Sequence, residues 1–435
     1  MSIRESIEKY VQSEPARFHM PGHKGIPKIY ENDVTELDFS GNLFSDEDDC
    51  ISELEERIPR VFFPNLPAGE VETSISCGGA TLCIQAAVLA MVRRSGSGNP
   101  TLICSRDSHI SLINAMALAG VNPLFLDSAD DLSDALTGKN KYSGHVGDII
   151  GVFVTSPDYF GNMKDISLIS EWCKYKNIPL AVDNSHGSHL AFHESGQLHP
   201  INCGAAISID SIHKTLPAPT GAALLHSRKP FGKTESIKPA MRVFASTSPS
   251  YLTLLGIESC IDFLEKRGRE EMRKCLARIE RFRPKPTGLY DPYRIVVSAV
   301  GKGKELYRFF AESGVMCEFA ACDKVVLIPS VNNSDDDFAR LESAYAEFTR
   351  VNKTEEPEPD PVYFPRTYAA VTLAEAVRSR TEKVSVESAV NKIAGNAVYA
   401  YPPGVPLVIP GEVITEEMIP LISEITDTIS IICRS

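Results

Sequence analysis

The chain has 435 residues, 43% of them hydrophobic, which is enough for two or three domains with sizeable cores. Its formal net charge is −13 and no basic tract offsets that charge, which argues against nucleic acid as the main partner. The sequence has no apolar run of about 18 residues, and its eleven cysteines are scattered without a CxxC pair. We therefore expect a soluble protein of the reducing cytoplasm that does not associate with a membrane.

Residues 1–30 are predicted to form an N-terminal helix, at 2–13, followed by an ordered loop. The loop contains Met20-Pro21-Gly22-His23-Lys24-Gly25, whose glycines, proline and basic groups are typical of a loop that holds an anion or a partner chain. An acidic stretch follows at residues 42–57, with four acidic residues in a row at 46–49. It fits either the solvated start of a helix or a site for a cationic substrate group.

Strands and helices alternate from residue 71 onward. The predicted strands are 101–104, 123–126, 149–155, 179–182 and 205–209, and the predicted helices are 82–92, 111–119 and 166–176. Such alternation indicates βαβ units and a mostly parallel sheet covered on both faces, hence an α/β fold. We assign this large domain to residues 31–250, and we expect its chemistry at the carboxyl ends of the strands.

The pattern changes after residue 250, where a smaller C-terminal α+β domain, or more than one, is predicted at 251–435. Predicted helices are 251–267, 270–283, 372–379 and 385–394, and predicted strands are 293–300 and 324–329. A segment rich in proline and glutamate near 353–362 is predicted to be an extended linker within this part of the chain.

Lys214 is the centre of the predicted functional site. An apolar run at 205–209 leads into Ser211-Ile212-His213-Lys214, and prolines follow. A lysine held against an apolar wall loses hydration, which favours the neutral amine needed for Schiff-base chemistry. A lysine after a strand is by itself more often a solvated loop residue, so the prediction depends on other groups.

Three further features precede Lys214, each at the end of a strand or the start of a helix. The turn Gly78-Gly79-Ala80-Thr81 opens a helix and suits a phosphate, His109 follows a strand and suits stacking on a flat ring, and Asp183 ends a strand. A carboxylate at Asp183 suits a protonated pyridine nitrogen. Each has an ordinary structural explanation alone, but together they favour pyridoxal 5′-phosphate (PLP).

The chain resembles the Orn/Lys/Arg decarboxylase family, whose members are fold-type-I PLP-dependent decarboxylases of basic amino acids. The motifs that carry the resemblance are Met20–Gly25, Arg106–His109, Asp183 with His186–His189, Ser211–Ala218, Ser246–Tyr251, Tyr401–Gly404 and Pro410–Glu412. The resemblance implies an aspartate-aminotransferase-like large domain and a homodimer, or a larger homo-oligomer, with active sites built from two subunits.

The resemblance also implies roles for single residues. Lys214 forms the Schiff base with PLP, Asp183 pairs with the pyridine nitrogen and His109 stacks on the ring. The other residues implied at the cofactor are Ala80, Thr81, His186, Ser211 and His213. After CO2 leaves, Lys214 or His213 is expected to return a proton to Cα. The product of arginine, lysine or ornithine would be a di- or polyamine.

A basic substrate needs a carboxylate at its far end. The candidates are Glu412, then the acidic cluster at 46–49, then Asp158, and His23 is a further candidate for substrate binding. The sequence leaves arginine, lysine and ornithine all open.

The chain departs from the family pattern at four positions and in length. Asn184-Ser185 stands where Glu-Ala is usual, Asp158 where threonine is common, and Cys77 where asparagine is usual. From its length we also expect a short form without the N-terminal wing domain of the large inducible members.

Three other functions stay open at this point. One is a PLP-dependent aminotransferase or lyase of the same fold, although no convincing C-terminal arginine is found for the α-carboxylate. Another is a PLP-binding protein without turnover. The third is a zinc site at His186, His189 and His193, whose spacing suits one helix face, but Gly187 favours a loop and no metal is predicted.

Overall fold

The computed structural model describes residues 9–25, 50–126, 131–137, 139, 147–229, 231, 237–282, 288–352, 365, 367–400 and 404–433. Four predictions lie wholly or partly outside these residues. They concern residues 2–8 of the N-terminal helix, the acidic cluster at 46–49, the linker at 353–362 and the motif residues 401–403. Among the described helices, none combines the length and the apolar character that crossing a membrane requires.

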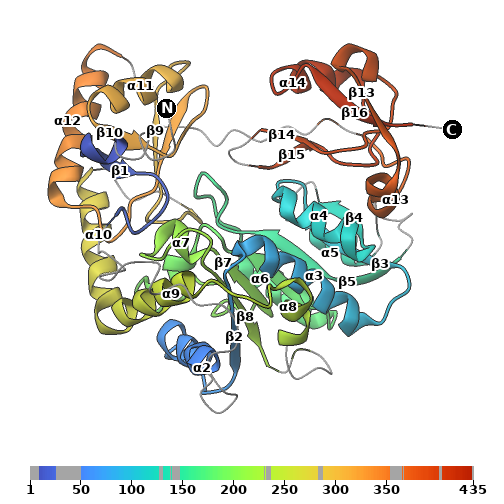
Figure 1. Ribbon diagram of the computed structural model, residues 1–435, viewed down its shortest axis with the longest axis horizontal. Helices are drawn as coiled ribbons and strands as arrows, with labels where there is room; N and C mark the ends of the chain where they lie inside the picture. The colour runs from blue at the N-terminus through green and yellow to red at the C-terminus, as the bar shows by residue number, and fades with distance from the viewer. Residues whose placement is uncertain are drawn as a thin grey trace.

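A seven-stranded sheet forms the centre of the molecule (Figure 1), in the order β2-β8-β7-β6-β5-β3-β4. The strands are β2 (Val71–Ser76), β3 (Pro100–Ser105), β4 (Asn122–Leu126), β5 (Asp148–Thr155), β6 (Leu180–Asp183), β7 (Ile207–Asp210) and β8 (Ala223–Arg228). Five neighbours, from β7 to β4, are parallel, and β8 runs antiparallel to both strands beside it. The predicted mostly parallel sheet is confirmed.

Helices cover both faces of this sheet, as the alternating pattern predicted. They include α3 (Gly79–Ser95), α4 (Ile110–Ala119), α5 (Leu132–Thr137), α6 (Ile166–Tyr175) and α8 (Lys238–Phe244). Successive residues of β5 point to opposite faces. Phe153 packs in the cluster with α3 and α4, whereas Val152 and Val154 pack with α5 and α6.

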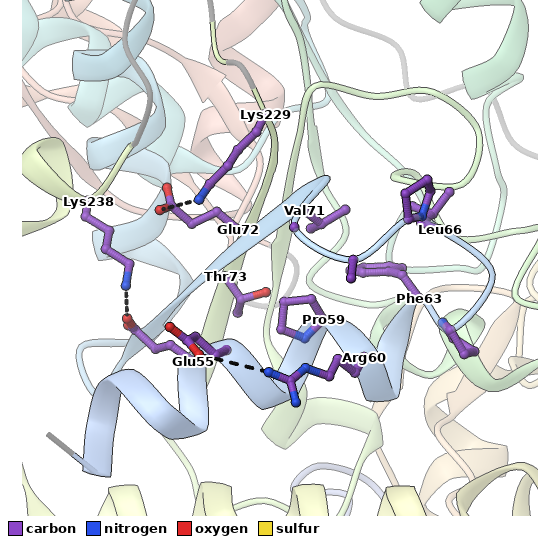
Figure 2. Close-up of a pocket in the computed structure, with 15 residues that line it drawn as sticks. Glu55, Pro59, Arg60, Phe63, Leu66, Val71, Glu72, Thr73, Lys229 and Lys238 are labelled. Atoms are coloured by element: carbon purple, nitrogen blue, oxygen red, sulfur yellow. Dashed lines mark ion pairs between the residues drawn. The ribbon is translucent and has the colours of Figure 1, made fainter. Parts of the chain in front are cut away.

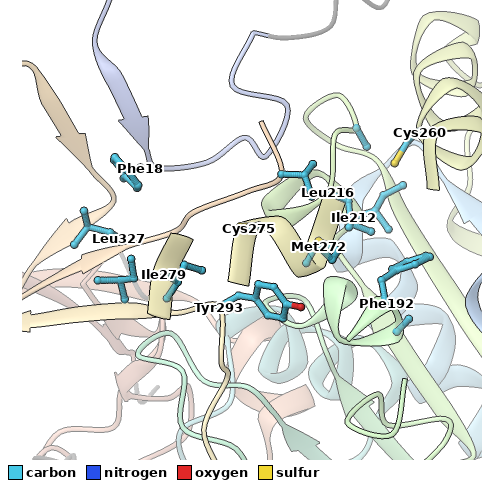
Figure 3. Close-up of a cluster of buried hydrophobic side chains, with 14 of the residues drawn as sticks. Phe18, Phe192, Ile212, Leu216, Cys260, Met272, Cys275, Ile279, Tyr293 and Leu327 are labelled. Atoms are coloured by element: carbon cyan, nitrogen blue, oxygen red, sulfur yellow. The ribbon is translucent and has the colours of Figure 1, made fainter. Parts of the chain in front are cut away.

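The next part of the chain forms a smaller α+β unit beside the sheet. Its elements are α9 (Tyr251–Phe263), a π-helical turn (Leu264–Gly268), α10 (Arg269–Phe282), β9 (Ile295–Ser298), α11 (Gly303–Glu312), β10 (Val315–Cys317), β11 (Phe319–Ala320), β12 (Lys324–Leu327) and α12 (Asp335–Val351). Strands β11, β12 and β9 form an antiparallel sheet. Figure 3 shows one continuous core, from Leu327 in this unit to Phe192 beside the central sheet.

The N-terminal segment joins the smaller unit. Strand β1 (Ala16–Phe18) pairs in parallel with β10, and Figure 1 shows it in blue beside the orange helices. The first residues of the predicted loop are therefore a strand. Phe18 is fully buried, and its ring meets the Phe338 ring edge-on with centroids 5.3 Å apart. The residues after Phe18 remain a loop, which lies over the end of the central sheet.

The last segment has α13 (Leu373–Arg378), β13 (Thr381–Ser385), a 3-10 turn η5 (Val386–Ala389), β14 (Val398–Tyr399), β15 (Pro406–Val408), a second 3-10 turn η6 (Glu416–Met418), α14 (Ile419–Ser423) and β16 (Thr428–Ile432). The predicted helix at 385–394 is wrong outside η5, because Ser385 ends β13 and because Ile393 and Ala394 form bridges with Val413 and Ile431. Earlier in the chain, α2 (Cys50–Phe62) makes the second half of the acidic stretch helical.

Candidate active site

The residues predicted at the cofactor lie at the carboxyl ends of β2, β3, β6 and β7 or on the segments that directly follow them. Thr81 is in the first turn of α3, His109 caps α4, Asp183 is the last residue of β6, and Lys214 lies on the short helix α7 (Ile212–Thr215) after β7. Parallel strands end at the same edge of a sheet, so this geometry brings together residues that are 133 positions apart at most.

The Lys214 amine lies 3.0 Å from Nε2 of His186. Desolvation lowers the pKa of Lys214 to about 8, and the nearby Asp183 carboxylate partly opposes this. The neutral amine, which Schiff-base chemistry needs, is therefore the minor form near physiological pH, but far more abundant than for an exposed lysine.

Asp183 is buried, with 4% of its surface exposed, and one of its two carboxylate oxygens is held in place. Oδ1 accepts the Ser185 backbone N–H at 3.1 Å and the Ser185 hydroxyl at 2.5 Å. No described residue donates to Oδ2. An oxygen of a buried aspartate to which no described residue donates fits a protonated pyridine nitrogen.

His109 and the start of α3 are connected through Ser111. Nδ1 of His109 accepts the Ser111 N–H at 3.1 Å, so the proton of the neutral ring is on Nε2. Burial lowers the pKa of His109, which keeps the ring neutral. The Ser111 hydroxyl lies 2.9 Å from the hydroxyl of Thr81. The ring and the expected phosphate position are thus fixed relative to each other.

The turn before α3 has the features of a phosphate cradle. The Gly79 N–H donates to the Gly221 carbonyl at 2.9 Å, and the Ala80 and Thr81 N–H groups follow in the first helical turn, which leaves them without intrahelical acceptors. A Cβ built on Gly79 meets no atom within 4 Å, so there is open space at the turn. A phosphate dianion fits this position and the positive end of the helix dipole.

His213 has a defined tautomer. Its Nδ1 lies 2.9 Å from the Ala222 carbonyl, which can only accept, so Nδ1 carries the proton and Nε2 has a free lone pair. Burial lowers the pKa of His213, which favours this neutral form. Ser211, just before α7, is buried beside it.

The loop with the Met20–Gly25 motif packs directly on α7. The Gly22 N–H donates to the His213 carbonyl at 2.8 Å, and a Cβ at Gly22 would lie 2.6 Å from the Leu216 carbonyl oxygen. Lys24 is also buried, donates to the carbonyls of His19 and Ile328, and has a pKa that desolvation lowers to about 7. These contacts indicate that the motif supports the helix that carries Lys214.

Gly22→Ala is therefore expected to destabilise the protein by about 1–3 kcal/mol, because the added methyl group overlaps backbone atoms that cannot turn aside. Urea unfolding monitored by circular dichroism measures this change. Gly98→Ala is the matched control, since a Cβ at Gly98 meets no atom within 4 Å. Equal unfolding midpoints for the two variants would contradict the close contact between the loop and α7.

Comparisons with known proteins agree with this geometry. The major-domain model of the Orn/Lys/Arg decarboxylases matches residues 69–313, more than half of the chain, and the C-terminal-domain model matches residues 352–428. The chain belongs to the Orn/Lys/Arg decarboxylase family. The prediction from the sequence motifs is confirmed.

Two curated relatives are similar over almost their whole length. An arginine decarboxylase of Bacillus subtilis is 26% identical over 95% of this chain and 91% of its own. One of Halalkalibacterium halodurans is 25% identical over 96% of this chain and 92% of its own.

Solved structures confirm the fold. Lysine decarboxylase A from Pseudomonas aeruginosa has a TM-score of 0.69 at 18% identity, over 97% of this chain and 75% of its own. The constitutive lysine decarboxylase of Escherichia coli has a TM-score of 0.68 at 16% identity, over 88% of this chain and 72% of its own. The predicted fold-type-I large domain with a smaller C-terminal part is therefore correct.

The departures from the Orn/Lys/Arg decarboxylase pattern have local partners. Ser185, in place of alanine, supplies the hydroxyl that holds Asp183. The Asn184 side chain donates to buried Asp210, at the end of β7, at 3.0 Å. Cys77, in place of asparagine, lies with its sulfur 3.8 Å from the Ser250 carbonyl. These replacements therefore do not displace the side chains that are predicted to face the cofactor.

The candidates for substrate binding that lie among the described residues, Glu412, Asp158 and His23, are engaged elsewhere. Glu412 pairs with Arg106 at 3.2 Å and accepts the Ile409 N–H, and burial raises its pKa while Arg106 opposes this. Asp158 accepts three hydrogen bonds from its own turn. His23 accepts the Gly25 N–H at 2.9 Å. Their role in substrate binding stays a prediction, and these contacts do not favour it.

Two charged residues near Lys214 were missed by the sequence reasoning. Glu318 accepts the Tyr159 hydroxyl at 2.6 Å and the Met20 N–H at 2.9 Å, and its charge raises the pKa of Lys214. Arg294 donates to Nδ1 of His186 at 3.3 Å. Both residues lie in the smaller α+β unit, and no sequence spacing links them to α7. The sequence therefore contained no signal that pointed to either residue.

The three histidines considered for zinc have separate partners. His186 faces Lys214, His189 faces Asp291 at 2.9 Å, and His193 faces the Tyr293 hydroxyl at 3.3 Å. Only one group of three among the described residues has side chains close enough to share a metal ion. This group consists of His199, Asp210 and His226. Nδ1 of His199 accepts the Ile201 backbone N–H, so its Nε2 carries the proton and donates to Asp210. Nε2 is therefore not available as a metal ligand in this state.

A surface hollow of about 620 Å³ lies between α2, β2 and the end of β8 (Figure 2). Ion pairs cross it between Lys238 and Glu55, at 2.6 Å, and between Lys229 and Glu72, at 3.5 Å. None of the predicted site residues lines this hollow. It is therefore not the candidate active site, although it is large enough to hold a small molecule.

Proposed function

We propose that the protein is a PLP-dependent decarboxylase that converts a basic L-amino acid, namely arginine, lysine or ornithine, into the corresponding di- or polyamine and CO2. The observation that carries the proposal is the convergence of Lys214, Asp183 and His109 at one edge of the sheet in a chain of the Orn/Lys/Arg decarboxylase family. Both curated relatives described above are named arginine decarboxylase, which supports arginine as a substrate.

The residues present fit PLP at each of its functional groups. Lys214 would hold the cofactor covalently, Oδ2 of Asp183 would accept a hydrogen bond from the protonated pyridine nitrogen, and His109 would cover the ring. The phosphate would lie at the start of α3, beside Thr81 and Ser211. PLP, when bound, supplies an electron sink for the electron pair that CO2 leaves behind.

The protein's own groups would control proton transfer. Nε2 of His213 has a lone pair and Lys214 has a pKa of about 8, so both can exchange protons near neutral pH. They lie next to each other on α7. Either group can take up a proton and, in its protonated form, return that proton to Cα of the substrate once CO2 has left.

A panel of L-arginine, L-lysine and L-ornithine tests the proposal. Purified protein loaded with PLP is incubated with each amino acid, and CO2, amine and keto acid are measured together. Equal amounts of CO2 and amine, with no keto acid, are expected for at least one substrate. Keto acid without CO2 would indicate an aminotransferase, and no product from any of the three would refute the proposal.

We also propose that the enzyme acts in the cytoplasm and that a homodimer is its minimum unit. Scattered free cysteines support a reducing compartment, and the family resemblance supports the dimer. Light scattering is expected to give at least twice the mass of one chain. A stable monomer with full activity would contradict the dimer.

A further inference from the structure

Arg294 is a buried cation whose position the proposed function does not explain. It lies just before β9 with 1% of its surface exposed, and its aliphatic part packs so closely that a Cβ on Gly161 would be 2.7 Å away. Its Nε and one terminal nitrogen have no hydrogen-bond partner among the described residues, and Asp291 is 4.0 Å from Nε. Its other terminal nitrogen lies 3.3 Å from Nδ1 of His186 and 3.5 Å from the His186 backbone carbonyl oxygen. Burying a guanidinium in this way is costly, so the contacts it does make are informative.

The contact between Arg294 and Nδ1 defines which nitrogen of His186 carries the proton. A guanidinium has donors and no acceptor, so Nδ1 of His186, 3.3 Å from Arg294, must be the unprotonated nitrogen. Burial lowers the pKa of His186 well below its usual value, with Lys214 and Arg294 acting in the same direction, so the ring is neutral. Its single proton is therefore on Nε2.

Nε2 of His186 is the atom that faces Lys214, at 3.0 Å. Because it carries the proton, it donates, and the Lys214 nitrogen must accept. An ammonium group has no lone pair, so only the neutral amine can accept this hydrogen bond.

We propose that Arg294 is a positioning residue that fixes His186 as the Nε2–H tautomer and thereby selects the neutral amine of Lys214. This inference rests on the proposed role of Lys214 as the cofactor lysine. The neutral amine is the form that attacks an aldehyde. Its nitrogen forms a C=N bond with the aldehyde carbon, and the aldehyde oxygen leaves as water.

Other groups around Lys214 also act on its charge. Asp183 on β6 and Glu318 before β11 favour the ammonium form, whereas burial and Arg294 disfavour it. The remaining titratable groups that face it are His186 and, at the site edge, His109 and His213. The rate of PLP capture is therefore expected to rise with pH, with a midpoint near the Lys214 pKa of about 8.

The first test measures PLP capture by the full-length protein without cofactor, as a function of pH, by stopped-flow absorbance. Arg294→Met is expected to raise the midpoint by about one pH unit and to slow capture at pH 7 about tenfold. Arg294→Lys keeps a positively charged group that can only donate hydrogen bonds, so the capture midpoint of this variant should stay close to that of the wild type. Arg281→Met, which removes a largely exposed arginine whose partner is Asp335, is the matched control.

The second test reads the tautomer directly. Nitrogen-15 NMR of the histidine-labelled protein is expected to show a ring with protonated Nε2 and bare Nδ1 that disappears in His186→Gln. His186→Gln should also raise the capture midpoint, which keeps the inference testable if Arg294→Met does not fold. A protonated Nδ1 in the wild type, or unchanged midpoints in folded Arg294→Met and His186→Gln, would overturn the inference.

These results separate the inference from the proposed function. If borohydride reduction and mass spectrometry show that the wild type does not attach PLP to Lys214, the proposed function fails. The tautomer measurement is made without cofactor and does not depend on that outcome.

Discussion

Lys214→Ala is expected to lower the rate of decarboxylation by at least about 10³-fold, or about 4 kcal/mol of transition-state stabilisation. The substitution removes the nitrogen that would hold PLP and one of the two groups on α7 that exchange protons. The rate of CO2 release at saturating PLP measures the loss. Mass spectrometry after borohydride reduction should find no attached cofactor.

The control for this variant is Lys266→Ala. Lys266 is exposed on the π-helical turn after α9, where its nearest acidic group is Asp262 at 3.9 Å. Such surface changes alter stability by about 0.5 kcal/mol or less, and the rate should equal that of the wild type. A Lys214→Ala protein that retained full activity would remove the proposed mechanism.

Asp183→Asn is expected to lower kcat by about 10³-fold, or about 4 kcal/mol, while PLP stays attached to Lys214. The amide is close to the carboxylate in size and can still accept from Ser185, but it has no charge to keep the pyridine nitrogen protonated. Steady-state rates give kcat, and the absorbance of the bound cofactor gives its occupancy. The prediction therefore distinguishes a loss of chemistry from a loss of cofactor.

Asp165→Asn is the matched control for Asp183→Asn. Asp165 caps α6 by accepting the Leu168 N–H at 3.0 Å. Asparagine is an equally good capping residue, so neither stability nor the rate should change appreciably. If Asp183→Asn retained the wild-type kcat, Asp183 could not be the partner of the pyridine nitrogen.

The local pattern of apolar residues was sufficient to predict the strands and helices of the central sheet. The predicted strand at 149–155 is β5 at Asp148–Thr155, and the predicted helix at 111–119 is α4 at Ile110–Ala119. These segments bury both faces of a strand or most of a helix, so their apolar residues form long, unambiguous runs. The proposed catalytic residues could be selected for the same reason, because Asp183 ends such a run and Lys214 follows another.

Local pattern was misleading where distant segments pair. Ser385 looked like the start of a helix, but it ends a strand whose partner, Thr428, is far along the chain. The same holds for Phe18, which belongs to a strand only because Cys317 lies beside it. Strand pairing depends on the partner, and a single segment does not contain that information.

The sequence by itself determined the α/β fold, the family and the lysine that would hold PLP, because these follow from periodicity and from motifs at strand ends. Only the tertiary structure decided the protonation around that lysine. Arg294 and Glu318 are 80 and 104 residues away from Lys214 in the chain, and they act on it through burial and charge. Hydrogen-bond direction and desolvation depend on which groups meet in space, and no spacing in the sequence specifies that.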